Sequence, residues 1–89
     1  LYYNRAINKV ASGQIESAIE DYNTAIDLDK QCDFVYVNRG NAKKKLQDFD
    51  GAIKDYTEAI RLNDNFAEAY YNRALATIAL YGESEDALN

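Results

Sequence analysis

Apolar residues recur along this chain at spacings of three and four, and the alternation of period two that marks a β-strand is absent. The chain also contains no Pro and only four Gly, so few residues interrupt a helix. This pattern predicts an all-α fold. The expected helices span residues 1–12, 14–28, 33–46, 48–62 and 65–81, where the last three ranges include the residue expected to cap the helix.

The breaks between the predicted helices carry turn and capping residues. Gly13 suits a tight turn after the first helix. Asp33 and Asp48 each precede an apolar run, where a carboxylate can cap a helix by accepting hydrogen bonds from its first N–H groups. Residues 81–84 predict a further break, with Ser84 as the cap of a last, short helix.

The sequence pattern returns every 34 residues. Tyr-Tyr-Asn-Arg at 2–5 becomes Tyr-Val-Asn-Arg at 36–39 and Tyr-Tyr-Asn-Arg again at 70–73. The Ala-Ile, Asp-Tyr and Ala-Ile pairs within residues 18–26 return in the same register within residues 52–60. A repeat this regular is typical of stacked helical units, in which each unit buries its apolar face against its neighbours.

Eighty-nine residues make one small domain, 1–89, which divides into repeats over 1–32, 33–66 and 67–89. The first residue, Leu1, lies inside a repeat, which indicates that the sequence is an excerpt of a longer protein. We therefore expect the first repeat to be truncated at its N-terminal end and the third at its C-terminal end.

Composition and charge narrow the range of partners. The net charge is −5, whereas a protein that binds nucleic-acid phosphates needs a basic surface. No apolar run in the sequence approaches the roughly 20 residues of a membrane-spanning helix. We therefore expect neither a nucleic acid nor a membrane as the partner.

The residues offer no recognisable catalytic or metal site. The chain has no His, and its one Cys, Cys32, has no recognisable base partner. The carboxylate pairs Asp27 with Asp29 and Asp48 with Asp50 lack the spacing of a calcium loop, so we interpret them as solvated or capping residues. We predict that the chain is not an enzyme and binds no cofactor or metal. Cys32 is expected to be half-buried, and a lone Cys is compatible with a reducing compartment such as the cytoplasm.

The repeated unit carries an aromatic and a small residue in its first helix, and Ala, aromatic and Ala positions in its second helix. The turn position holds Gly in the first and third copies, as Gly13 and Gly82. In the middle copy these positions, with a Leu before the turn, are Tyr36, Gly40, Leu46, Ala52, Tyr56 and Ala59. This 34-residue hairpin resembles the tetratricopeptide repeat over essentially the whole chain. The resemblance implies an α-solenoid, a right-handed superhelix of antiparallel helix hairpins that serves as a protein-interaction scaffold.

The resemblance also implies that the first helix of each hairpin lines a concave groove. Tyr2, Tyr36 and Tyr70 would pack inward, so that their neighbours face the groove. The candidate partner-binding residues are Tyr3, Asn4, Ile7, Val37, Asn38, Asn41, Lys45, Tyr71, Asn72 and Leu75. Further residues expected on this face are Val10, Phe34, Lys44, Glu68 and Ile78.

Two uses of the repeated Asn residues remain open. Asn4, Asn38 and Asn72 can pair with the backbone of an extended peptide, because an amide side chain both donates and accepts hydrogen bonds. They can equally bond across neighbouring repeats. Apolar residues of the same face, such as Tyr71 and Leu75, would receive apolar side chains of the partner.

The repeated Arg residues are interpreted as structural. Arg5 and Arg39 are expected to pair with Asp21 and Asp55, and all three repeated Arg residues, Arg73 included, could lie over Tyr rings. The basic run at 43–45 is expected to be a solvated face, with an acidic partner at the groove as the alternative.

One subclass of the family can be tested by residue. Domains that bind chaperone C-termini resemble one another in a clamp of Lys, Asn, Asn, Lys and Arg across three first helices. The matching positions here hold Tyr3, Ile7, Asn38, Glu68 and Asn72, of which only Asn38 agrees. A Glu in place of a Lys repels a carboxylate, so the chain is predicted not to bind a chaperone tail.

The sequence therefore predicts a protein-interaction scaffold that presents a concave groove to a peptide or protein. Two alternatives remain. The chain could self-associate through uncapped terminal repeats, because the end of the stack would expose the apolar residues Ala74, Ile78 and Tyr81. It could also be a regulatory domain of a larger protein.

Overall fold

A computed structural model describes residues 2–88, with side chains described from residue 3 to residue 82. Its five helices are α1 (Tyr2–Ala11), α2 (Ile15–Leu28), α3 (Asp33–Lys45), α4 (Phe49–Leu62) and α5 (Ala67–Leu88). No strand interrupts residues 2–88, so the all-α prediction is confirmed. Within the same residues, no helix has the length and apolar character needed to cross a membrane.

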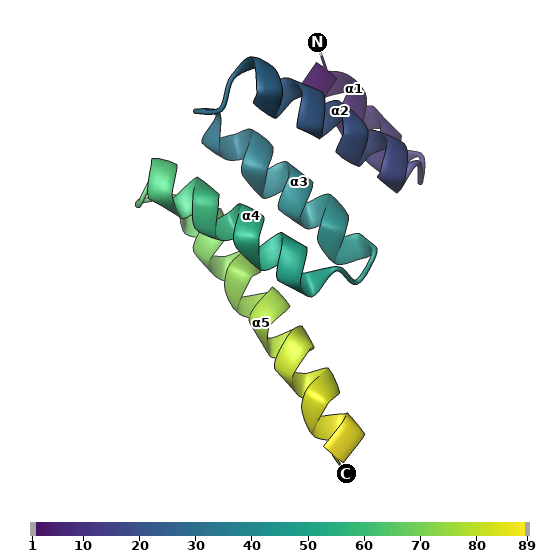
Figure 1. The fold of residues 1–89 in the computed structure, drawn as a ribbon, viewed down its shortest axis with the longest axis vertical. Coiled ribbons are helices and arrows are strands. Elements are labelled where there is room, and N and C mark those ends of the chain that lie inside the picture. The colour runs from purple at the N-terminus through teal and green to yellow at the C-terminus, as the bar shows by residue number, and fades with distance from the viewer. Residues whose placement is uncertain (1, 89) are drawn as a thin grey trace.

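The helices form a stack of antiparallel hairpins (Figure 1). Short connections join α1 to α2 and α3 to α4, and each helix packs against the next in chain order. In addition, α3 contacts both α1 and α5, which places the first helices of successive repeats side by side. The molecule measures 46 × 30 × 17 Å. Because packed helices lie about 8–10 Å apart, the thinnest dimension corresponds to two layers of helices.

Small residues allow the helices to pack closely. Six Ala residues are fully buried at helix contacts: Ala6, Ala18, Ala52, Ala59, Ala69 and Ala76. Between them lie the larger buried residues Tyr22, Val35 and Tyr56. The predicted inward-facing Tyr36 belongs to this core, but the same prediction is wrong for Tyr70, which is exposed. The side chain of Tyr2 lies outside the described side chains.

The turns of the two hairpins share an unusual backbone conformation. Gly13 has a φ of +86°, and Gln47, which lies 34 residues later, has a φ of +64°. Both turns close in the same way: Gln14 N–H donates to the carbonyl of Lys9 at 2.8 Å, and Asp48 N–H donates to the carbonyl of Lys43 at 2.9 Å. The left-handed region suits Gly, so Gln47 adopts it under strain.

Replacing Gln47 with Gly is expected to stabilise the fold by about 0.5–1 kcal/mol, because relief of this strain outweighs the greater freedom of Gly in the unfolded chain. Urea unfolding followed by circular dichroism would measure the change. Gly13→Ala is the matched control and should destabilise the equivalent turn, where a Cβ would meet no atom within 4 Å and only backbone strain would change. A lower unfolding midpoint for Gln47→Gly would contradict this account.

One predicted cap is confirmed and one is wrong. The carboxylate of Asp48 accepts a hydrogen bond from Gly51 N–H at 3.0 Å and caps α4. At the start of α3, however, the N-cap is Cys32, which makes no capping side-chain bond. Asp33 is the first helical residue, and its carboxylate instead accepts hydrogen bonds from Asn63 Nδ2 at 3.0 Å and from Phe34 N–H at 2.8 Å.

The predicted break at 81–84 is wrong. The helix α5 runs without interruption to Leu88, through Gly82 and Ser84, and extends beyond the other helices (Figure 1). A Gly inside a helix costs only about 1 kcal/mol relative to Ala, and no Pro blocks the backbone hydrogen bonds. A turn at this point would also give up helical hydrogen bonds. Within residues 2–88, no further helix packs against α5 to make up for that loss.

Candidate functional site

The first helices of the repeats, α1, α3 and α5, together form one surface, which we call the first-helix face. Two side-chain contacts cross it. The rings of Tyr3 and Phe34 meet edge to face with centroids 5.4 Å apart, which joins α1 to α3. Lys44 Nζ donates to Asn72 Oδ1 at 3.4 Å, which joins α3 to α5. The face is therefore continuous across all three of these helices.

Large apolar side chains are exposed on the first-helix face. They are Ile7, Phe34, Tyr71, Leu75 and Ile78. Tyr71 is the most exposed of the predicted partner-binding residues in this group, at 66%. On α5, Tyr71, Leu75 and Ile78 follow at spacings of four and three, so they share one side of that helix. A partner could bury these side chains without any rearrangement of the core.

One predicted contact residue is wrong. Val37 is only 1% exposed and belongs to the core rather than to the surface. Its counterparts in the neighbouring repeats are Tyr3, which is half-buried, and Tyr71, which is exposed. Val37 is enclosed because α3 is the middle helix and packs against both α1 and α5. The repeat pattern did not show how completely the neighbouring helices cover this position.

The amide side chains of this face differ in their surroundings. Asn4 is exposed and Asn38 is half-buried, whereas Asn72 accepts the hydrogen bond from Lys44. Asn41 accepts a hydrogen bond from the hydroxyl of Tyr56 at 2.5 Å, which gives it a structural role. The corresponding residues in the other repeats are Ile7 and Leu75. The sequence did contain a signal of this role, because Asn41 is an amide at a position where the other two repeats carry an aliphatic residue.

The basic run at 43–45 divides into three environments. Lys43 Nζ lies 3.2 Å from Asp55 Oδ2 and forms an ion pair. Lys44 is half-buried and bonded to Asn72, and Lys45 is exposed. Glu68 is exposed near the start of α5. Lys44 therefore lies on the first-helix face, and Lys45, the next residue of α3, is open to solvent.

The structural interpretation of the repeated Arg residues is confirmed. Arg39 donates to both carboxylate oxygens of Asp55, at 2.9 and 2.6 Å, and lies 5.6 Å from the ring centroid of Tyr36. Arg73 lies 5.5 Å from the ring centroid of Tyr70 and donates to the hydroxyl of Thr57 at 3.3 Å. The bonds to Asp55 and Thr57 join α3 and α5 to α4, whereas the ring contacts lie within α3 and within α5.

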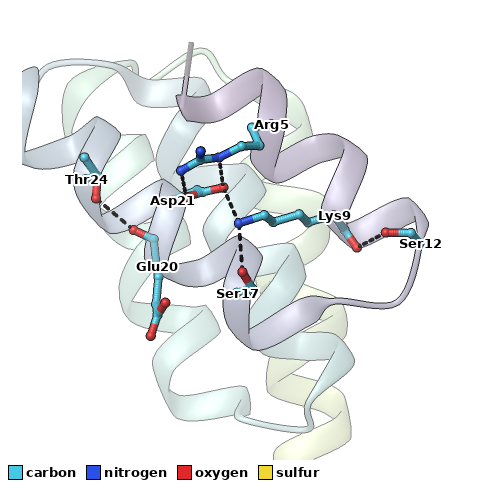
Figure 2. Close-up of polar contacts among 7 residues, drawn as sticks. All are labelled: Arg5, Lys9, Ser12, Ser17, Glu20, Asp21 and Thr24. Carbon is cyan, nitrogen blue, oxygen red and sulfur yellow. Dashed lines mark hydrogen bonds and ion pairs between the residues drawn. The ribbon is translucent and has the colours of Figure 1, made fainter.

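The equivalent pair in the first hairpin is Arg5 with Asp21. Figure 2 shows the Asp21 carboxylate between Arg5 and Lys9. Arg5 donates to it at 2.8 and 2.7 Å, and Lys9 Nζ lies 3.0 Å away. The hydrogen bonds from Arg5 hold the pKa of the Asp21 carboxyl group at about 2, below its ordinary value of 3.8, although burial acts in the opposite direction.

This pKa predicts how acid affects the fold. A carboxyl group with a lowered folded-state pKa stabilises the fold above its unfolded pKa, and this contribution is lost as the pH falls through the folded value. The contribution of Asp21 should therefore be complete at neutral pH and disappear between about pH 4 and about pH 2. Melting temperatures of the wild type and Asp21→Asn would test this. Their difference should shrink across that window, and a constant difference would contradict the assignment.

Cys32 is half-buried at the junction of the first two hairpins, as predicted. Its thiol donates a hydrogen bond to the carboxylate of Asp29 at 3.1 Å, and this bond is the main cause of a raised pKa of the Cys32 thiol. Asp29 is exposed and also accepts from Gln31 N–H at 3.0 Å, within the turn between α2 and α3. A raised pKa leaves less of the nucleophilic thiolate.

Comparison with known proteins supports the helical-repeat architecture. A family model described as "TPR repeat" matches residues 8–47 and 40–80. Among curated proteins, no sequence matches the chain significantly.

Several solved structures have the same fold. The second TPR of Spaghetti (RPAP3), bound to the HSP90 peptide SRMEEVD, is 31% identical with a TM-score of 0.88, covering 94% of this chain and 78% of that one. The Arabidopsis OM64 TPR domain is 26% identical with a TM-score of 0.87, covering 94% and 69%. TPR2B of yeast Sti1, in complex with an Hsp70 peptide, is 29% identical with a TM-score of 0.83, covering 90% and 64%.

Proposed function

Because the chain belongs to the tetratricopeptide repeat family, we propose that it is a protein-interaction scaffold whose first-helix face binds an extended segment of a partner protein. The observation that carries this proposal is the row of exposed apolar side chains on that face, Tyr71, Leu75 and Ile78 on α5 with Ile7 and Phe34 beside them. Burial of apolar surface supplies the main driving force for most protein association.

The binding mechanism follows from the rigidity of the stack. The first-helix face is held by helix packing and by contacts such as Tyr3 with Phe34, so it needs little ordering when a partner binds. The exposed amide of Asn4 and the half-buried amide of Asn38 can bond to the backbone of the partner segment. The apolar side chains then select apolar residues of the partner.

The partner is proposed not to be a chaperone C-terminal tail. The similar RPAP3 domain binds SRMEEVD, a peptide that ends in acidic residues and a terminal carboxylate. At the positions that match the clamp, this chain carries Tyr3, Ile7 and Asn72 in place of cationic or amide residues, and Glu68 adds a negative charge. The terminal carboxylate of SRMEEVD is therefore expected to contribute nothing to binding, so the free-acid peptide and its C-terminally amidated copy should bind equally weakly, which isothermal titration calorimetry would check.

The main test compares two variants, each with one exposed Leu replaced by Glu. One Leu lies on the first-helix face and the other lies away from it. Leu75→Glu should weaken partner binding by at least about tenfold, because a charge must then be buried against apolar partner residues. Leu28→Glu is the matched control, since Leu28 is exposed at the end of α2. Affinity capture with mass spectrometry would identify partners, after circular dichroism has shown equal helicity. Identical partners for both variants would contradict binding at this face.

Self-association is the second candidate. It is favoured by the exposure of Tyr70, which is 42% exposed while its counterpart Tyr36, covered by α4, is 8% exposed. Ala74 and Tyr81 are exposed on the same helix. Sedimentation velocity over a range of concentrations would detect self-association, and Ala74→Arg should abolish it. A chain that stays monomeric at the highest concentration removes this candidate.

A further inference from the structure

The charges of this acidic chain are unevenly distributed. Exposed carboxylates are frequent on the second helices, for example Glu16, Glu20 and Asp27 on α2 and Asp50 on α4. On the first-helix face, Lys44 and Lys45 stand together at the end of α3, and Glu68 lies near the start of α5. A molecule with a net charge of −5 therefore presents a local basic patch on the face that is proposed to bind a partner.

Lys44 and Lys45 differ from the lysines that stabilise the fold. Lys9 and Lys43 each form an ion pair with a buried Asp, at 3.0 and 3.2 Å. Neither Lys44 nor Lys45 pairs with a carboxylate among the described side chains. The hydrogen bond from the Lys44 ammonium group to Asn72 is long, at 3.4 Å. An ammonium group has three donors, so Lys44 can bond a further acceptor.

The position of the Lys44 ammonium group relates it to the apolar side chains of α5. It reaches across from α3 to Asn72, and Leu75 lies one helical turn further along α5 on the same side. Ile78 follows three residues later and is exposed. A cation and a strip of apolar side chains therefore lie next to each other on one surface.

We propose that the first-helix face selects a segment in which an Asp or Glu side chain lies close to an apolar side chain. Lys44 and Lys45 bind the carboxylate, while Leu75 and Ile78 bind the apolar side chain. This inference rests on the proposed function and specifies the chemistry of its partner. The acidic group is a side chain within the segment, because Lys44 and Lys45 stand outside the positions that match the chaperone-tail clamp.

The experiment is a selection from a displayed library of random peptides of about ten residues, each with its C-terminus joined to the carrier. The wild-type chain should enrich peptides that combine Asp or Glu with a neighbouring Leu, Ile, Phe or Tyr. A selected peptide is then synthesised with an amidated C-terminus, beside a copy with Asn or Gln in place of its acidic residue. Fluorescence anisotropy would measure the dissociation constants of both.

Two double variants distinguish a direct role of Lys44 and Lys45 in binding from the effect of removing two positive charges anywhere on the protein. Lys44→Gln with Lys45→Gln should weaken binding of the acidic peptide on the order of tenfold and leave the amide copy nearly unchanged, because a charge-assisted bond is lost only in the first case. Lys30→Gln with Lys54→Gln removes the same charge from exposed positions in the α2–α3 connection and on α4, and should change binding less than about twofold.

The outcomes distinguish the two proposals. If the selected peptides are apolar without enriched acidic residues, or if both double variants weaken binding equally, the role of Lys44 and Lys45 is wrong while the proposed function stands. If no peptide is selected by a chain whose circular dichroism spectrum is helical, peptide binding at this face is itself contradicted. A requirement for a free C-terminal carboxylate would also overturn the inference of an internal acidic side chain.

Discussion

Replacing Tyr56 with Ala is expected to lower the free energy of unfolding by about 3–5 kcal/mol, the range for truncating a large buried aromatic side chain. Tyr56 is 0% exposed and is the largest fully buried side chain of the described residues. Its ring packs against Gly40, and its hydroxyl donates to Asn41. The substitution therefore leaves a cavity between α3 and α4 and deprives Asn41 of its donor.

A loss of this size is large for so short a chain. Domains are typically stable by only about 5–15 kcal/mol, and a chain of this length lies at the lower end. Urea unfolding followed by circular dichroism would measure the effect. Tyr71→Ala is the matched control because Tyr71 is exposed, and it should change stability by less than about 0.5 kcal/mol. Equal unfolding midpoints for the two variants would show that the core is misplaced.

The contact between Tyr56 and Gly40 also explains why the middle repeat carries Gly where the first repeat carries Ala. A Cβ on Gly40 would lie 2.7 Å from Cε1 of the Tyr56 ring, closer than real contacts allow. In the first hairpin, the corresponding residue is Ala6, which is fully buried with its methyl group accommodated. The helices α3 and α4 therefore approach each other so closely at this point that only Gly fits without a shift of the Tyr56 ring. The small residue of the repeat pattern thus sets the spacing of each hairpin.

Most of the fold could be predicted because the repeat shows which residues of different helices occupy equivalent positions, which the pattern of a single helix cannot show. The 34-residue register gave Ala18 and Ala52 one place in the repeated unit and Ala25 and Ala59 another. Ala18, Ala52 and Ala59 are fully buried, and Ala25 is half-buried. The register could not show that Gln47 takes the backbone conformation of Gly13, because the residue type argues against a positive φ. The turn between α3 and α4 closes through the hydrogen bond from Asp48 N–H to the carbonyl of Lys43, as the first turn does around Gly13.

The surface was harder to predict than the core. Helix periodicity tells which side of a helix a residue occupies, but its exposure depends on the neighbouring helices. Val37 is buried for this reason although Tyr71, at the same position of the next repeat, is exposed. The contact between Lys44 and Asn72 joins residues 28 apart in the sequence and depends on how α3 and α5 lie. Neither arrangement follows from the spacing of residues along one helix.

Removal of the Asp55 carboxylate is the second change with a large expected effect. Asp55 is buried and receives two hydrogen bonds from Arg39, while Lys43 forms an ion pair with it. The side chains of Arg39 and Lys43 are 18% and 22% exposed, so water reaches them poorly. Loss of the anion leaves both cations close together with no carboxylate between them, and Arg39 keeps only neutral partners such as Asn23 Oδ1, to which it donates at 2.8 Å. Asp55→Ala is expected to cost about 3–5 kcal/mol, as when one partner of a buried ion pair is removed.

The first hairpin supplies the internal control for this argument. Asp21 has the same partners in sequence, Arg5 and Lys9, but the Arg5 side chain is 59% exposed and remains hydrated when the anion is removed. Asp21→Ala should therefore destabilise the fold less than Asp55→Ala under the same conditions, because a hydrated cation carries a smaller desolvation penalty. Urea unfolding of both variants at neutral pH would compare them directly. Equal destabilisation would indicate that burial of the cations does not decide the strength of these pairs.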